Sequence, residues 1–129
     1  MIKNLSHISL FTNSLSKVEN FYVKKLELKI VHKFKNKDNE VYGYFLSANK
    51  NTFLEFFLTE KKINFDNHQN CFRHICFEVK NIKRFKKKFF NQPRTKIVRG
   101  KTDKILQFFK KDLEGNIVEF HQRDRQSIF

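Results

Sequence analysis

Two histidines and two glutamates recur at matching places in this 129-residue sequence. The segment HISLFTNSLSKVENFY, which starts at His7, aligns with HICFEVKNIKRFKKKF, which starts at His74. Further on, YFLSANKNTFLEFF aligns with FFKKDLEGNIVEFH, so that Glu55 matches Glu119. Imidazole nitrogens and carboxylate oxygens together are a ligand set that suits a divalent transition metal and leaves positions for water or substrate.

Each of the four residues has apolar neighbours in the sequence. Side chains alternate along a strand, so these neighbours share one face and the His or Glu lies on the other. A buried carboxylate is costly unless it is paired, hydrogen-bonded or bound to a metal. Two interpretations follow: the four residues converge on a metal, or the histidines are structural and the glutamates form buried salt bridges with lysines.

The elements that must position these residues repeat as well. Each half reads as a strand, a helix and three further strands, which predicts an α+β fold of two paired βαβββ modules. Module 1 spans about residues 3–62 and module 2 about residues 70–123, within a single domain of residues 1–129. The expected apolar stripe of the first helix is Leu15, Val18, Tyr22 and Leu26, with a capping box at Ser16 and Glu19; that of the second is Ile82, Phe85 and Phe89, before Pro93.

The formal net charge is +14, from 27 Lys and Arg against 13 Asp and Glu. Such a charge is typical of proteins that bind nucleic acid or anionic membranes. However, the chain favours residues with A/T-rich codons throughout, and in the basic run Lys83–Phe90 the aromatic residues fall on the expected core face of a helix. We therefore expect no nucleic-acid partner, although a basic surface attracts anionic small molecules.

The sequence has no run of about 18 apolar residues and no signal-peptide pattern at its start, which predicts a cytoplasmic protein without a membrane partner. Its two cysteines, Cys71 and Cys76, support neither a disulfide framework nor a zinc ribbon. Free thiols fit the cytoplasm. A nucleophilic Cys76 is a minor alternative.

The segments HISLF, FLEFF, FRHICFEV and FFKKDLEGNIVEFHQ together resemble the vicinal oxygen chelate superfamily, over about residues 3–123. This superfamily includes glyoxalase I, bleomycin-resistance proteins, fosfomycin-resistance enzymes, methylmalonyl-CoA epimerase and extradiol dioxygenases. The resemblance implies curved sheets that form an open barrel or cleft (the glyoxalase-like fold), and a homodimer. Asp112, Gly115 and Asn116 supply the chemistry of the last turn, which lacks the family's proline.

The resemblance also implies one divalent metal, Ni, Co, Zn, Mn or Fe, held by His7, Glu55, His74 and Glu119. The His-Glu-His-Glu order is similar to that of bacterial glyoxalase I. Epimerases of the superfamily usually have Gln in the second place, and extradiol dioxygenases generally lack the extra glutamate. Fosfomycin-resistance enzymes favour an Arg/Ser-rich stretch where this chain has DKILQFF.

The predicted function is therefore that of a metal-dependent, glyoxalase I-like lyase or isomerase, which moves a proton on a small oxygenated substrate through a metal-bound enediolate. Glu55 or Glu119 would carry the proton, and each histidine would donate its second ring N–H to an acceptor. The alternatives are a fosfomycin-resistance-type thiol transferase or hydrolase, an epimerase, a dioxygenase, a non-catalytic small-molecule-binding module and a basic nucleic-acid-binding protein.

The substrate is expected to be a small molecule, either an anion or a thiol adduct. Phe11 and Thr59 stand where glyoxalase I has an arginine and an asparagine that bind glutathione, so the resemblance does not extend to the glutathione contacts. Candidate substrate contacts are Tyr44, on a strand, and Arg99 and Lys101, near the loop that binds substrate carboxylates in glyoxalase I.

Overall fold

The computed structural model describes residues 1–63 and 72–129. Cys71 lies outside the described residues. The chain divides into two compact units, Met1–Asn64 and Phe65–Phe129, and each is described by itself. None of the described helices is long and apolar enough to cross a membrane.

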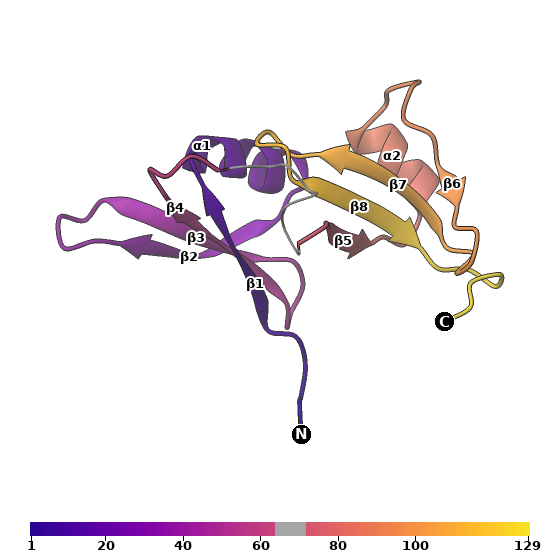
Figure 1. Ribbon diagram of the computed structural model, residues 1–129, viewed down its shortest axis with the longest axis horizontal. Coiled ribbons are helices and arrows are strands. Elements are labelled where there is room, and N and C mark those ends of the chain that lie inside the picture. Colours follow the sequence, from indigo (N-terminus) through magenta and orange to yellow (C-terminus); the bar gives the residue numbers. More distant parts are fainter. Residues whose placement is uncertain (64–71) are drawn as a thin grey trace. The chain divides into compact units, whose positions relative to one another are not determined.

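The first unit has one sheet and one helical segment (Figure 1). The four strands lie in the order β1-β4-β3-β2, with β1 parallel to β4 and the other neighbours antiparallel. The elements are β1 (His7–Thr12), α1 (Leu15–Val18), η1 (Glu19–Lys25), β2 (Lys29–Lys35), β3 (Val41–Ser47) and β4 (Phe53–Leu58).

The second unit repeats this topology, with strand order β5-β8-β7-β6. Here β5 is parallel to β8, and the other neighbours are antiparallel. The elements are β5 (Ile75–Glu78), α2 (Ile82–Phe89), β6 (Val98–Arg99), β7 (Leu106–Lys111) and β8 (Ile117–Gln122). Both units are βαβββ, which confirms the predicted α+β, glyoxalase-like architecture; the four-stranded sheets are not closed into a barrel.

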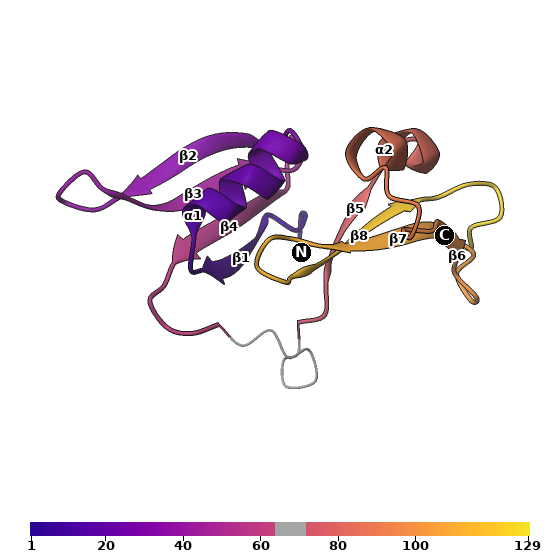
Figure 2. The same cartoon turned by 90° about the horizontal axis from the view of Figure 1, so that it is seen from above.

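In each unit the helix covers one face of its sheet, and the core lies between them (Figure 2). In the first unit Tyr22 from the helix meets Phe56 from β4 at 5.0 Å between ring centroids. In the second unit Phe120 of β8 stacks on Phe108 of β7 and contacts Phe85 of α2. Alternation along the strands leaves the opposite face, here termed the uncovered face of each sheet, for the other side chains.

The first helical segment differs from the expected helix in two respects. Its N-cap is Ser14, whose side chain accepts a hydrogen bond from the Lys17 amide, so the predicted capping box at Ser16 and Glu19 is wrong. Beyond Val18 the segment is a π-helix. The wider π turn brings Phe21 into the core at 3% exposure, beside Tyr22.

The second helix follows the prediction closely. Asn81 caps α2 by accepting from the Arg84 amide at 2.9 Å, and Ile82 is buried. Phe85 and Phe89 are half-buried on the same side. Most of the basic residues of this helix are exposed, so the run is the solvated face of an amphipathic helix, as predicted.

Candidate metal-binding residues

In the first unit His7 and Glu55 lie on the uncovered face of neighbouring parallel strands. Glu55 is the register partner of Ser9, two residues after His7 on β1. His7 Nε2 lies 3.9 Å from Glu55 Oε2, and the two side chains are 45% and 15% exposed. The other ring nitrogen, Nδ1, lies 3.3 Å from Ser6 Oγ, which is the kind of acceptor expected behind a metal-binding histidine.

In the second unit His74 and Glu119 hold the equivalent positions. His74 immediately precedes β5, and Glu119 on β8 is the register partner of Cys76. His74 Nε2 lies 3.0 Å from Glu119 Oε2, and Glu119 is only 8% exposed. His74 Nδ1 is buried and, within residues 1–63 and 72–129, has no hydrogen-bond partner; the expected acceptor for this ring nitrogen is not among the described residues.

Among the described residues, no lysine forms an ion pair with Glu55 or Glu119. In the part of the chain that the structure describes, the ion-pair partners of Glu55 and Glu119 are imidazoles alone. The predicted alternative of buried Lys–Glu salt bridges is therefore not found among these residues. A desolvated carboxylate without a Lys or Arg counter-charge is suited to accept a metal ion.

The donor distances test whether a metal suits each pair. Nitrogen and oxygen ligands lie about 2.0–2.2 Å from a divalent transition metal, so neighbouring ligands in an octahedral site are about 3.0 Å apart. The 3.0 Å between His74 Nε2 and Glu119 Oε2 matches this separation. The 3.9 Å between His7 Nε2 and Glu55 Oε2 is about 0.9 Å wider than this separation.

Glu119 has a second set of neighbours that the sequence analysis did not assign to a site. Its other oxygen, Oε1, lies 3.6 Å from His121 Nδ1, and Cys76 Sγ lies 3.3 Å from the same nitrogen. Strand alternation could have found both residues, since Cys76 follows His74 and His121 follows Glu119 by two positions. The repeat predicts as metal ligands only the residues that match in both modules.

Cys76 is a free, exposed cysteine at this point of the sheet. Partial desolvation, followed by the negative charge of Glu119, raises the pKa of the Cys76 thiol to about 12. The thiol is therefore protonated at neutral pH, whereas nucleophilic cysteines have a lowered pKa. This argues against the minor alternative of a nucleophilic Cys76.

Tyr44 lies on the helix side of its sheet. It is 8% exposed, it pairs in register with the core residue Phe56, and its hydroxyl donates to Glu19 Oε2 at 3.2 Å. Burial, and then the Glu19 carboxylate, raise the pKa of Tyr44. The structure therefore does not bring Tyr44 to the uncovered face that carries His7 and Glu55.

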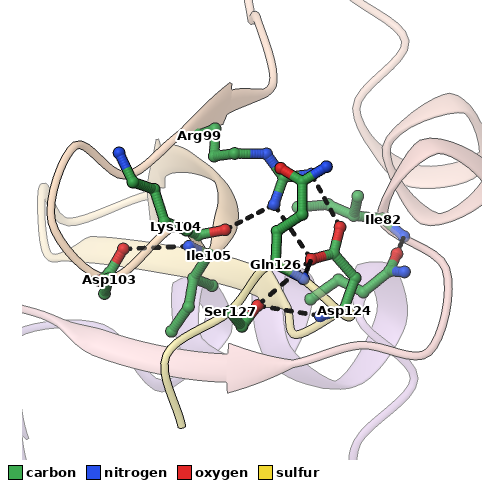
Figure 3. Close-up of polar contacts among 9 residues, drawn as sticks. Ile82, Arg99, Asp103, Lys104, Ile105, Asp124, Gln126 and Ser127 are labelled. Carbon is green, nitrogen blue, oxygen red and sulfur yellow. Dashed lines mark hydrogen bonds and ion pairs between the residues drawn. The ribbon is translucent and has the colours of Figure 1, made fainter.

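Arg99 and Lys101 lie in and beside β6, and Figure 3 shows the contacts of Arg99. Both terminal nitrogens of Arg99 donate to the Asp124 carboxylate, at 3.0 and 2.7 Å, and one also donates to the Lys104 carbonyl. The hydrogen bonding of Arg99 to the Asp124 carboxylate lowers the pKa of Asp124 to about 2. Arg99 thus anchors the C-terminal segment, while Lys101 is an exposed turn residue.

A cavity of about 590 Å³ lies beside His74 in the second unit. This volume is in the range of small-molecule sites. Apolar groups and cations line it together, namely Arg73, His74, Phe109, Lys110, Lys111 and Ile117. Lys110 is already engaged, because its ammonium group donates to Gln92 and Thr95. Arg73 and Lys111 are exposed and form no ion pair with a described residue.

Comparison with known proteins agrees with the topology. The sequence model of the Glyoxalase/Bleomycin resistance protein/Dioxygenase superfamily matches residues 4–120. The chain therefore belongs to this superfamily, as its sequence motifs predicted. A search of curated proteins gives no match.

Several solved structures share the fold at low sequence identity. A glyoxalase family protein from Enterococcus faecalis is 20% identical, with a TM-score of 0.75 and coverage of 92% of this chain and 97% of that one. A lactoylglutathione lyase from Agrobacterium tumefaciens is 18% identical, with a TM-score of 0.69 and coverage of 94% of both chains. At these identities the likeness establishes the fold alone.

Proposed function

We propose that this chain is a metal-dependent, glyoxalase I-like lyase or isomerase that moves a proton on a small oxygenated substrate. The observation that carries the proposal is the His–Glu pair that recurs on the uncovered face of both sheets, at the same topological positions. A set of four ligands needs two such pairs, His7 with Glu55 and His74 with Glu119. They come either from the two units of one chain or from two chains of a homodimer.

A divalent metal held by these residues acts as a Lewis acid, which polarises substrate oxygens and makes an adjacent C–H more acidic. The two imidazoles anchor the site, and the Ser6 hydroxyl orients the His7 ring through Nδ1. One of the two glutamates takes the proton from one carbon and returns it to the next. Both side chains are mostly shielded from water, at 15% and 10% exposure, which favours proton transfer to substrate over exchange with solvent.

The cavity beside His74 supports an anionic substrate. Arg73 and Lys111 place positive charge on its lining, while Phe109 and Ile117 provide apolar surface. This combination fits a short oxygenated carbon chain with one carboxylate or phosphate, bound with its reactive end toward His74. We further propose that the protein is cytoplasmic, in line with the free thiol of Cys76.

The test is exchange of substrate C–H for deuterium in D₂O, followed by NMR. The untagged protein is loaded with Ni²⁺, Co²⁺, Zn²⁺, Mn²⁺ or Fe²⁺ and offered anionic α-hydroxy carbonyl compounds and the hemithioacetals of 2-oxoaldehydes with several thiols. We expect metal-dependent exchange, which Glu55→Gln or Glu119→Gln slows by about 10²–10⁴-fold. We also expect the two variants to differ in metal content: the variant that lacks the proton-carrying glutamate should retain more bound metal than the variant that lacks the other glutamate.

The control is His32→Gln, which changes an exposed histidine of β2, two strands away from Glu55 on β4 in the sheet order. This variant should exchange at the wild-type rate. Exchange that does not depend on metal, or that persists in both glutamate variants, would contradict the proposed chemistry.

A further inference from the structure

Three side chains of the second unit bring a thiol, a carboxylate and an imidazole together on the uncovered face. The donor atoms of Cys76, Glu119 and His121 all lie within 4.8 Å of one another. The residues are adjacent because Cys76 and Glu119 are register partners across β5 and β8, and His121 follows Glu119 on the same face of β8. All three lie in one unit, so the cluster is complete without the other.

The distances fit a tetrahedral metal centre. With sulfur about 2.3 Å and nitrogen or oxygen about 2.0–2.2 Å from Zn²⁺, a tetrahedral site places sulfur about 3.5–3.7 Å from a nitrogen or oxygen ligand, and two nitrogen or oxygen ligands about 3.3–3.6 Å apart. Cys76 Sγ and His121 Nδ1 are 3.3 Å apart. His121 Nδ1 and Glu119 Oε1 are 3.6 Å apart. The nitrogen–oxygen separation falls in its range, and the sulfur–nitrogen separation is about 0.2 Å shorter than a bound ion would impose.

The cluster is specific to the second unit, although the two units share a topology. The matching segments are His7-Ile8-Ser9 and His74-Ile75-Cys76 on the first strands, and Glu55-Phe56-Phe57 and Glu119-Phe120-His121 on the last. Ser9 and Phe57 therefore stand where the second unit has Cys76 and His121. The His–Glu pair recurs in both repeats, while the thiol and the additional imidazole are found in one.

The two oxygens of Glu119 face different imidazoles. Oε2 lies 3.0 Å from His74 Nε2, and Oε1 lies 3.6 Å from His121 Nδ1. The Glu119 carboxylate can therefore bind a metal ion on the His74 side, on the His121 side, or on both sides. The cluster of Cys76, Glu119 and His121 therefore shares one residue with the proposed His–Glu–His–Glu site and needs no other member of it.

We infer that Cys76, Glu119 and His121 form a second metal site, selective for an ion that accepts thiolate together with nitrogen and oxygen, such as Zn²⁺ or Co²⁺. Three protein ligands leave one position of a tetrahedral centre for water or a small ligand. When the sulfur binds, the Cys76 thiol releases its proton to solvent and the ion keeps its oxidation state. The exposure of Cys76 at the surface gives the ion a route of entry.

The test is a Co²⁺ titration of the reduced, metal-free full chain without a tag. Thiolate ligation produces a sulfur-to-cobalt charge-transfer band in the near ultraviolet, which nitrogen and oxygen ligands do not give. Wild type should show the band, and Cys76→Ser should abolish it. His121→Phe should weaken Co²⁺ binding by roughly tenfold or more, since even the residues behind metal ligands contribute 10–100-fold. Both variants introduce the residue that the first unit has at the same position.

The matched controls separate this site from the His–Glu pairs. Cys71→Ser, which removes the other cysteine, and His74→Gln, which disrupts only the first site, should both keep the band. The inference is overturned if Co²⁺ binds without the band, if the band survives Cys76→Ser, or if no Co²⁺ binds. If wild type lacks the band but keeps His7- and His74-dependent metal binding, this inference is overturned and the proposed function stands. If wild type shows the band but has no His7- or His74-dependent metal binding, this inference stands and the proposed function is overturned.

Discussion

Glu119 is the residue on which most of the proposed chemistry depends. The residue is 8% exposed, yet its partners among the described residues are two imidazoles and a thiol rather than a Lys or Arg. Burial of a charge without a strong counter-charge is unfavourable, so such groups are retained where a function requires them. Glu78, two residues after Cys76, shows the contrast: it is exposed and forms a two-point ion pair with Arg123.

Arg99 leads to a prediction about pH. Because Arg99 lowers the pKa of Asp124 from 3.8 to about 2, the ion pair should stabilise the fold above about pH 4, and this stabilisation should be lost as the pH falls through about 2. In Arg99→Gln the Asp124 titration, followed by carboxyl NMR, should shift up toward 3.8. The stability difference from wild type should shrink as the pH falls from 4 to 2.

Lys101→Gln is the matched control, since it removes a cation from the neighbouring turn without touching Asp124. It should leave the Asp124 titration in place. An unchanged Asp124 titration in Arg99→Gln would show that the Arg99–Asp124 hydrogen bonds drawn in Figure 3 are not formed in solution. Arg99 would then again be a candidate contact for an anionic substrate.

At the scale of elements, the N-terminus of the first helix gives a second prediction. Ser14→Ala should lower the free energy of unfolding by about 0.5–2 kcal/mol, because the Lys17 amide loses its acceptor. Ser16→Ala, at the exposed position that the sequence pattern had suggested for the cap, should change it by less than about 0.5 kcal/mol. Urea unfolding of the two variants measures both, and equal losses would contradict the assignment of Ser14.

The elements show which kind of structure the sequence could predict. Strand alternation placed Ile75, Val118 and Phe120 on the core face and His74 and Glu119 on the other, because a period of two is a property of any strand. The π-helix could not be predicted in the same way. Phe21 and Tyr22 are both buried in this segment, and a pattern with a period of 3.6 residues does not predict a π turn.

The substrate contacts were harder to predict for a related reason. Arg99 has the chemistry of an anion contact, but its partner Asp124 is 25 residues away. No local pattern encodes that pairing. Tyr44 sits on the expected strand, yet its hydroxyl is taken by Glu19 of the helix. The tertiary structure determines which of several possible partners a polar side chain binds. The apolar periodicity, in contrast, can be read directly from the sequence.

At the scale of the whole molecule, the repeat explains why the fold and the ligand set could be predicted together. One βαβββ unit provides one His–Glu pair, and a duplicated unit provides two. Cys76 and His121 break the repeat, so a ligand set predicted from positions common to both copies does not include them. The net charge of +14 is carried partly by the solvated face of α2 and partly by Arg73 and Lys111 beside the cavity.

The most direct test of the central claim is metal content after reconstitution, measured by plasma mass spectrometry on untagged protein. A double variant, His7→Gln with His74→Gln, should bind about one metal ion per chain less than wild type, while His32→Gln should match wild type. Wild-type protein that holds less than about 0.2 metal per chain after reconstitution, or a double variant that keeps the full wild-type content, would contradict the claim that the His–Glu pairs hold a metal.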